Sequence, residues 1–404
     1  MLTKWVRSMG EYVPFFENEQ VIGFINSGGD FTRIIHENES KTILWYNDEI
    51  GFKITDMVNG FNVEIDGDII YLWNFLDLTP GVFGYIIDSV EEYVKEISKL
   101  VEKELNGRKT LLSYSGGKDS TAGLIVALKL QEFINFDLKV VYSHVPFLES
   151  PENIKFIEYV AKKLNIDIEI LEADRETILE KLKKFGLPYR GFRWCTYQKV
   201  KPIRKIKKKL NIDCEIVSER AWESYKRMLA LSQYAKQRKF IIGGQFKIVY
   251  PLTILDVVKI SKEEGIIHND YLKGYTRVSC DLCPYRNIFE LKESINKVED
   301  PGLIDSIIKF EHEQWYKKIS SLEEFNKFAL WRFNEPMARL AIKIRKKVIK
   351  EEREEIKCSK ICSKYKEIWL KSNIKAPNLK IEDTLKLIAK AIETNNYGIL
   401  NNNP

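Results

Sequence analysis

The sequence TLLSYSGGKDS, residues 110 to 120, decides the fold of this chain. It begins as a short apolar strand, turns at Gly116 and Gly117, and continues into a helix that we expect to reach about residue 133. Two adjacent glycines bring backbone N–H groups toward an anion, the helix N-terminus adds partial positive charge, and Lys118 adds a full one. Ser115 and Ser120 can donate hydroxyl hydrogen bonds to phosphate oxygens. The stretch therefore predicts a phosphate-binding loop, and its spacing before Gly-Lys is too short for a Walker loop.

Strands and helices alternate downstream of this loop. Short β-branched runs at 139–143, 166–171 and 215–218 predict strands, and the periodicity of 152–164 and 175–185 predicts helices between them. Strands that alternate with helices of this length form βαβ units around a parallel sheet. The sequence therefore predicts an α/β fold with a central, Rossmann-like parallel sheet.

The two flanks have different textures. Runs at 42–46, 61–65 and 69–73, with a turn at 66–68, predict a small antiparallel module before a linking helix at 86–106. After residue 305 the chain is expected to be helical to about residue 395, most clearly at 323–333 and 337–366. We expect three parts: a β-rich module with its linking helix at 1–105, the α/β domain at 106–300 and a helical region at 301–404.

Composition agrees with a globular protein of two or three domains. The 404 residues are 44% hydrophobic and 30% charged, which excludes disordered, collagen-like and coiled-coil classes. The net charge of +6 is compatible with nucleic-acid or anionic-nucleotide partners but is not diagnostic. No run of about 18 apolar residues predicts a membrane span, and the start lacks the apolar stretch of a secretory signal, so we expect a cytoplasmic protein without a membrane partner. Six cysteines in such a chain favour metal or redox use over a disulfide framework.

Four further motifs follow the loop in order. They are Arg193-Trp194-Cys195-Thr196 with Lys199 and Pro202, the segment from Ser218 to Arg227, Pro251-Leu252 through Asp256-Val257, and Gly274-Tyr275-Thr276-Arg277-Val278-Ser279-Cys280-Asp281-Leu282-Cys283-Pro284. With the loop, they resemble the phosphoadenosine phosphosulfate (PAPS) reductase family of the PP-loop ATP-pyrophosphatase superfamily over about residues 109–290. The tryptophan of the family's third motif is not preserved. The resemblance implies the PP-loop fold for this domain.

The resemblance also implies a nucleotide site for ATP or adenylyl sulfate, with Mg as a further expected ion. Its nucleotide-binding residues would be Ser115, Gly116, Gly117, Lys118, Asp119, Ser120, Arg193 and Lys199. Its catalytic residues would be Lys118, Asp119, Arg220 and Arg227, whose cations would neutralise phosphate charge that develops in the reaction.

The cysteines divide into ligand candidates and a core residue. Cys280-x-x-Cys283 has the spacing with which two thiolates bind one metal or cluster. Iron–sulfur members of the family imply Cys195, Cys280 and Cys283 as ligands of a 4Fe-4S cluster, with the fourth ligand from Cys358 or Cys362; we select Cys362. A zinc site is the alternative. Cys214, in an apolar strand, is expected to be structural.

Two departures from the family bear on the reaction. Sulfonucleotide reductases carry a nucleophilic cysteine in a C-terminal E-C-G-[LI]-H element, and nothing like it follows Cys362. Many relatives also place Asp-Thr-Gly after the second strand, where this chain has Ser143-His144-Val145. An intact loop without the reductase nucleophile resembles the ATP-using branch of the superfamily.

We therefore expect an enzyme of nucleotide-activated sulfur transfer that adenylates its substrate and releases pyrophosphate, with an iron–sulfur cluster. The alternatives are a PAPS or adenylyl-sulfate reductase that releases sulfite and, in another class, a non-catalytic nucleotide- or nucleic-acid-binding subunit. The acceptor would be a nucleic acid (tRNA or DNA) or a small molecule, with a protein donor of sulfur or electrons. A basic run between residues 343 and 350 is an ion-paired helix face or a nucleic-acid contact.

Overall fold

The fold is taken from a computed structural model of residues 1–404. The structure describes residues 84–223, 225–286, 288–339, 341–342, 366–372, 374, 376 and 378–393 and, before residue 84, the backbone of seven strands.

The N-terminal strands confirm the expected β-rich module. Five of them form an antiparallel sheet in chain order, and the last two pair antiparallel with Ile65 opposite Asp68. The sheet contains β1 (Tyr12–Glu17), β2 (Gln20–Asn26), β3 (Arg33–Asn38), β4 (Lys41–Tyr46) and β5 (Ile50–Ile54), and the hairpin contains β6 (Phe61–Ile65) and β7 (Asp68–Leu72).

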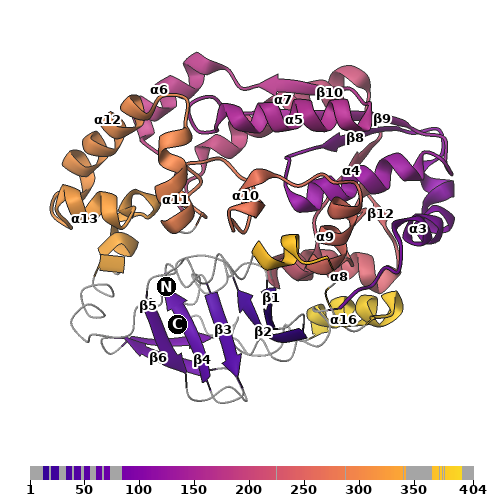
Figure 1. The fold of residues 1–404 in the computed structure, drawn as a ribbon. Helices are drawn as coiled ribbons and strands as arrows, with labels where there is room; N and C mark the ends of the chain where they lie inside the picture. Colours follow the sequence, from indigo (N-terminus) through magenta and orange to yellow (C-terminus); the bar gives the residue numbers. More distant parts are fainter. Residues whose placement is uncertain are drawn as a thin grey trace.

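A six-stranded sheet forms the centre of the molecule (Figure 1). Its spatial order is β10-β9-β8-β11-β13-β12, and all neighbouring pairs are parallel except β12 with β13. The strands are β8 (Lys109–Ser113), β9 (Asp137–His144), β10 (Ile168–Glu172), β11 (Cys214–Ile216), β12 (Ile241–Ile242) and β13 (Gln245–Phe246). The predicted α/β class with a mostly parallel sheet is therefore confirmed.

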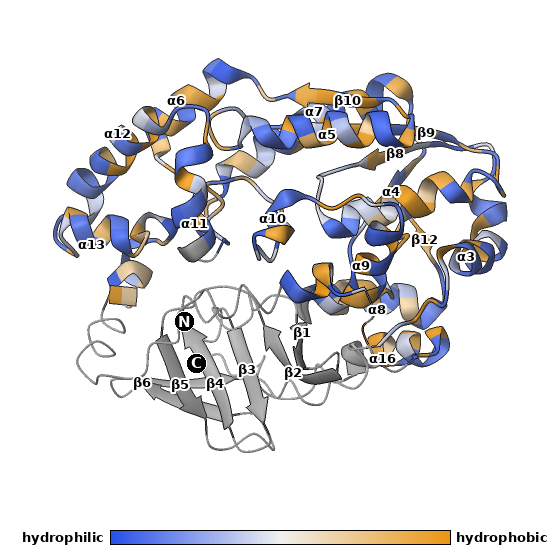
Figure 2. Ribbon diagram, viewed as in Figure 1, coloured by the Kyte–Doolittle hydropathy of each residue, from blue (hydrophilic) through white to orange (hydrophobic). Residues whose placement is uncertain are grey.

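Helices cover this sheet, and Figure 1 shows them on either side of it. Ser150, Asp174 and Thr253 cap the N-termini of three of them by accepting backbone N–H hydrogen bonds. In Figure 2 hydrophobic and hydrophilic residues alternate along most of the helices, as expected when one face of each is buried. The helices are α3 (Val90–Leu105), α4 (Lys118–Leu130), α5 (Pro151–Leu164), α6 (Arg175–Phe185), α7 (Trp194–Leu210), α8 (Tyr225–Gln237) and α9 (Ile254–Glu263).

Strand β8 is first in the sheet's chain order yet lies between β9 and β11. The chain winds outward through β9 and β10 on one side of β8, and then returns to add β11 on the other side. Open α/β sheets bind ligands outside the carboxyl ends of their strands at such a switch point. The fold therefore directs attention to the loops that follow β8 and β11.

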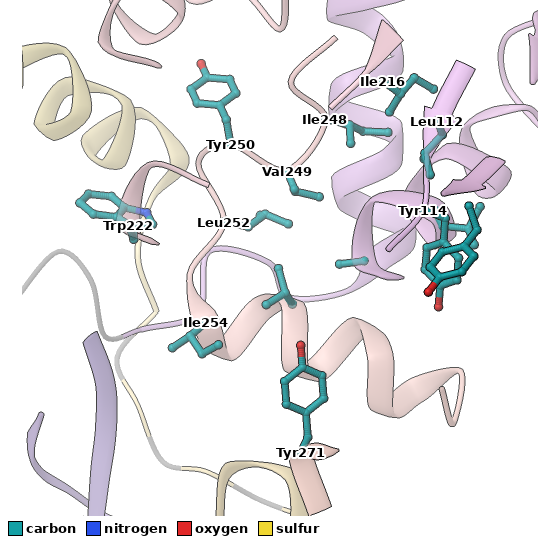
Figure 3. Packing of buried hydrophobic residues seen from close by; sticks show 14 of the residues in the cluster. Leu112, Tyr114, Ile216, Trp222, Ile248, Val249, Tyr250, Leu252, Ile254 and Tyr271 are labelled. Carbon is teal, nitrogen blue, oxygen red and sulfur yellow. The ribbon is translucent and has the colours of Figure 1, made fainter. Parts of the chain in front are cut away.

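The core beside these loops is apolar. Leu112, Ile216 and Ile248 are at most 2% exposed and lie together near the ends of β8 and β11 (Figure 3). Cys214, at the start of β11, is 1% exposed, which confirms its expected place in the core.

The C-terminal region is helical where it is described, with one correction. The helix predicted at 323–333 ends at Lys327, Ala329 has a positive φ of 46°, and a 3₁₀ turn follows at Leu330–Arg332. Residues 328 to 333 are all buried, and a continuous helix would have exposed some of them. The shortened helix is α13 (Leu322–Lys327), and the region also contains α12 (Pro301–Glu311) and α16 (Ile381–Glu393). Two short helices, α10 (Asn269–Leu272) and α11 (Ile288–Ser294), precede it.

Most of the helix predicted at 337–366, and the whole basic run at 343–350, lie outside the described residues. Within the part of the chain that is described, no helix has both the length and the apolar character needed to cross a bilayer.

The end of α12 carries a carboxyl group whose titration we expect to affect stability. Glu311 is 3% exposed and accepts a hydrogen bond from the backbone N–H of Leu187; burial raises its pKa to about 8. Because the pKa is raised in the folded protein, its contribution to stability is complete below about pH 4.5 and is lost as the pH rises toward 8.

Replacing Glu311 with Gln keeps the acceptor oxygen and removes the ionisation. From pH 5.5 to 8.5 the free energy of unfolding should fall less in this variant than in the parent. The difference between the two falls should be a few kcal/mol, because one pKa unit corresponds to about 1.4 kcal/mol. Urea unfolding at both pH values measures the difference. Equal pH dependence in parent and variant would contradict the raised pKa.

Candidate functional site

The loop after β8 has the conformation expected of an anion cradle. Gly116 has a φ of +74°, which side-chain-bearing residues rarely adopt, and Gly117 is the N-cap of α4 without a side-chain cap. The hydroxyls of Ser115 and Ser120 lie 2.9 Å apart, and that of Ser120 also donates to the carbonyl of Gly117 at 2.9 Å. The first turn of a 13-residue helix therefore faces the loop, and its N-cap residue is a glycine without a side chain to bond the N–H groups of that turn.

A buried ion-pair cluster connects the loops after β8 and β11. Lys118 Nζ lies 3.3 Å from Asp119 Oδ2, and Asp119 accepts a hydrogen bond from Nε of Arg220, a residue with 0% exposure. Burial alone would raise the pKa of Asp119, but Arg220 and Lys118 outweigh it and hold that pKa at about 2. Asp119 is therefore a carboxylate at neutral pH, and it fixes two cations at the switch point of the sheet.

Further cations surround this cluster. Arg227 pairs with Glu223 one turn earlier, and it lies close enough to Asp119 to lower the pKa of that carboxyl. Arg277, in the fourth sequence motif, is exposed and close enough to Arg227 to help lower its pKa, after the larger effect of burial. The structure thus brings together Lys118, Asp119, Arg220 and Arg227, and it adds Arg277, which the sequence motif contains but our site prediction omitted.

Tyr271 is a second residue that our site prediction omitted. The backbone N–H of Lys118 donates to the Tyr271 hydroxyl at 2.7 Å, and the Tyr271 ring stacks on Trp369 with centroids 4.4 Å apart at 12° (Figure 3 shows the Tyr271 ring). The Tyr271 hydroxyl oxygen thus accepts a hydrogen bond from one N–H of the loop, and its own O–H can still donate one. No local pattern marks Tyr271, because its partners lie 153 and 98 positions away in the sequence.

A second polar cluster follows β9. Glu149 is 1% exposed and accepts hydrogen bonds from the Tyr142 hydroxyl at 2.9 Å, from Lys199 Nζ and from the Cys280 thiol at 2.9 Å. Burial opposes the ionisation of Glu149, yet Lys199 and the hydrogen bonds hold its pKa well below the usual range. His144 Nδ1 lies 3.3 Å from this carboxylate. His144 is thus part of a buried ionic network around Glu149.

The same cluster bears on the predicted metal ligands. Cys195 and Cys283 are close enough to Cys280 to help raise its pKa, after the larger effects of burial and Glu149, and burial raises the pKa of Cys195 to about 11. However, the described residues contain no group of three His, Cys, Asp or Glu placed to hold a metal ion. Cys280 donates a thiol hydrogen bond to Glu149. The ligand set stays a prediction, and Cys358 and Cys362 lie outside the described residues.

Arg193 and Lys199, predicted to bind the nucleotide, lie with these cysteines. Arg193 is exposed at the N-cap of α7, and its guanidinium lies 5.1 Å from the centre of the Tyr285 ring. Lys199 bonds Glu149 and lies 3.9 Å from Cys280 Sγ. Both clusters are at the carboxyl ends of parallel strands, since β9 neighbours β8.

The comparisons with known proteins agree with the motifs. Residues 109–286 match the family model of the phosphoadenosine phosphosulfate reductase domain. Two uncharacterized proteins of Methanocaldococcus jannaschii are similar: one is 26% identical over 82% of this chain and 72% of its own length, the other 29% identical over 59% of each.

Similar solved structures have low overall superposition scores. The U34-tRNA thiolase NcsA of Methanococcus maripaludis, with its 4Fe-4S cluster, has a TM-score of 0.35 and 16% identity over 58% of this chain and 80% of its own. The PAPS reductase of Candida auris, as a phosphate complex, has a TM-score of 0.31 and 14% identity over 48% of this chain and 97% of its own.

Proposed function

We propose, from the match of residues 109–286 to the phosphoadenosine phosphosulfate reductase domain, that the protein is an ATP-dependent sulfurtransferase. It binds ATP with the phosphates on the Ser115–Ser120 loop and releases pyrophosphate there. The observation that carries this proposal is the ion-pair set of Lys118, Asp119 and Arg220, in which both cations are buried. It joins the loop after β8 to the loop after β11 at the switch point of the sheet.

The first step is adenylation of the acceptor. An acceptor oxygen attacks the α-phosphorus of ATP; the new O–P bond forms as the bond to the bridging oxygen breaks, and that electron pair leaves with pyrophosphate. Negative charge then grows on the leaving group. Lys118 and the N-terminus of α4 stabilise this charge. The Lys118 ammonium needs no reorientation, because Asp119 holds it in position before the reaction begins.

The second step is sulfur transfer. A hydrosulfide or persulfide sulfur attacks the carbon that bears the adenylated oxygen, the C–O bond breaks, and AMP leaves with the electron pair. A persulfide donor also needs a thiol reductant to release the sulfur that it has transferred. Adenylation makes this substitution possible, since AMP is a far better leaving group than hydroxide or oxide.

ATP is favoured over adenylyl sulfate for a reason present in the sequence. A reductase uses a cysteine nucleophile in an E-C-G-[LI]-H element, which residues 1–404 do not contain, whereas they do contain the pyrophosphate loop. A loop that holds pyrophosphate is most useful when pyrophosphate is the leaving group.

Two assays on the purified full chain test the proposal. With ATP, Mg and hydrosulfide, we expect release of AMP and pyrophosphate that depends on an added acceptor. With adenylyl sulfate and a thiol reductant, we expect no sulfite. Sulfite release that depends on Cys358 or Cys362 would favour the reductase instead. ATP binding without turnover for any acceptor tested would favour a non-catalytic nucleotide-binding subunit.

The metal ligand set remains a prediction, and the proposal does not depend on it. We expect anaerobically purified protein to contain iron that is lost when Cys280 and Cys283 are both replaced with Ser, and retained in Cys214→Ser, because Cys214 belongs to the core. Iron analysis and the visible spectrum measure this. Equal iron in the parent and the double variant would remove Cys280 and Cys283 as ligands, and zinc in place of iron would identify the alternative metal.

A further inference from the structure

Helix α7 carries a row of exposed basic side chains that the nucleotide site does not use. Tyr197, Lys201, Arg204, Lys205 and Lys208 follow one another at intervals of four, three, one and three residues, so they share one face of the helix. All five are exposed, and Tyr197 is exposed by 58%. We call these five residues the α7 stripe.

The charge of this region stands out from the rest of the chain. Residues 175–210, which span α6 and α7, contain thirteen Lys and Arg and two Glu, a net charge of +11. Since the whole chain carries +6, the other 368 residues together carry −5. The basic character of the protein is therefore concentrated on these two adjacent helices, which contact each other.

The stripe differs from an ordinary solvated helix face. Helix α3 in the same chain interleaves five Glu with three Lys, whereas the 17 residues of α7 contain no acidic residue. None of the four stripe cations lies within 4 Å of a carboxylate of any described residue. Hydrogen bonds from Thr177 lower the pKa of Asp174, and Lys201 and Lys205 add a smaller effect in the same direction. Like charges at these intervals repel one another, so the row itself does not stabilise the helix.

A helix-dipole role explains only the last turn. Lys207, Lys208 and Lys209 lie in that turn, where cations are favourable, and Lys207 pairs with Glu215 at 2.7 Å. Lys201, Arg204 and Lys205 lie before it. These three cations need another explanation, and an anionic partner supplies one.

The stripe begins near Cys195 and the Glu149 cluster. Its first residue, Tyr197, follows Cys195 by two positions, and the same helix turns Lys199 inward to Glu149 beside Cys280. A long anion that lies along the stripe would therefore have one end near Cys195 and Cys280. Tyr197 offers an exposed ring at that end, and aromatic rings beside basic rows are surfaces on which bases stack.

We propose that the α7 stripe binds the sugar–phosphate backbone of a nucleic acid, with an unpaired base on Tyr197, and so presents the sulfur acceptor to the site. This inference rests on the proposed function, since it names the acceptor as a group within a nucleic acid. Lys and Arg rows that follow one helix face suit a regular phosphate backbone, and they make binding strongly dependent on salt.

The test measures binding of fluorescent nucleic acids to the full chain by anisotropy, over a series of salt concentrations. The probes are an RNA hairpin, the corresponding single-stranded DNA and a DNA duplex, with vesicles of anionic lipid as the non-nucleic comparison. The test variant is Lys201→Gln/Arg204→Gln/Lys205→Gln/Lys208→Gln. The matched control removes four exposed cations elsewhere: Lys239→Gln/Lys309→Gln/Lys317→Gln/Lys386→Gln, with side chains 52–68% exposed.

We expect the stripe variant to bind nucleic acid on the order of 100-fold more weakly, with the slope of log affinity against log salt reduced by about three, from about 0.7–0.9 per phosphate contact. The control should keep the parent's slope within about one. Tyr197→Ala should weaken binding of the RNA hairpin and single-stranded DNA more than binding of the duplex, because the duplex has no unpaired bases.

ATP binding separates this proposal from the proposed function. The stripe variant should bind ATP as the parent does, since no stripe residue lies in the loop. Equal nucleic-acid binding by the stripe and control variants would overturn the stripe while leaving the ATP site intact. Stripe-dependent binding to vesicles but to none of the nucleic acids would overturn it as well. If the protein bound nucleic acid through the stripe but did not bind ATP, the nucleic-acid surface would be supported and the proposed sulfurtransferase function would be contradicted.

Discussion

Replacing Lys118 with Met is expected to weaken ATP binding at least 100-fold, about 2.7 kcal/mol, while the protein remains folded. Lys118 is 5% exposed, and its ammonium lies 3.3 Å from the Asp119 carboxylate. Lys118 is also the first residue of α4, the helix whose N-terminus faces the loop. Met preserves the length of the side chain and removes only the charge and its hydrogen bonds. Isothermal titration calorimetry with ATP and Mg measures the loss.

Lys129→Met is the matched control, because Lys129 lies at the other end of α4 and pairs with Glu91 and Glu264 at the surface. It should change ATP affinity less than twofold, since surface ion pairs contribute about 0–1 kcal/mol to stability and this one is remote from the loop. Unchanged ATP affinity in Lys118→Met would contradict the assignment of the phosphates to this loop.

The fold could be predicted because its signals are local. The run of 110–120 contains a strand, its turn and a helix start within eleven residues, and the structure places β8, Gly116 and α4 accordingly. The strand of 139–143 and the helix of 152–164 were also recognisable from periodicity and shifted by at most two residues at either end. Hydrophobic spacing specifies such elements without knowledge of the rest of the chain.

Contacts across long sequence separations could not be predicted in this way. Glu149 meets Lys199 and Cys280 after 50 and 131 residues, and nothing in the local sequence of Glu149 distinguishes it from a surface carboxylate. The burial of Glu149 makes these contacts necessary, because a buried charge requires partners. The cysteines illustrate the same limit: their spacing predicts a shared ligand set, but it gives no sign that the Cys280 thiol also donates a hydrogen bond to Glu149.

The helix break at Ala329 has a similar cause. Helical periodicity predicted one helix through 323–333, but its second half, residues 328–333, is apolar except for Arg332. Such a segment does not define a single buried helix face, so tertiary packing decides where the helix ends. Here it ends after Lys327, and the residues that follow are buried individually.

The second large effect is expected at the ion pair that spans the switch point. Arg220→Met should lower the free energy of unfolding by about 3 kcal/mol, because it leaves the Asp119 carboxylate with one of its two main cations in a buried setting. The pKa of Asp119, now about 2, should rise toward its ordinary value. Since that pKa is depressed in the folded protein, its stabilising effect is present above about pH 4 and is lost toward pH 2, and the variant should lack this dependence.

A double-mutant cycle separates stability from catalysis at this pair. Asp119→Asn/Arg220→Met should recover much of the stability lost in Arg220→Met, because it leaves no unpaired buried charge. It should not recover turnover, which we expect to fall on the order of 100- to 1,000-fold in both variants. Both lack Arg220, and the double variant also lacks the carboxylate that orients Lys118. Urea unfolding and pyrophosphate release measure the two quantities. If the double variant regained both, Asp119 and Arg220 would serve only the fold, and the phosphate charge would have to be neutralised by Lys118 and the remaining arginines.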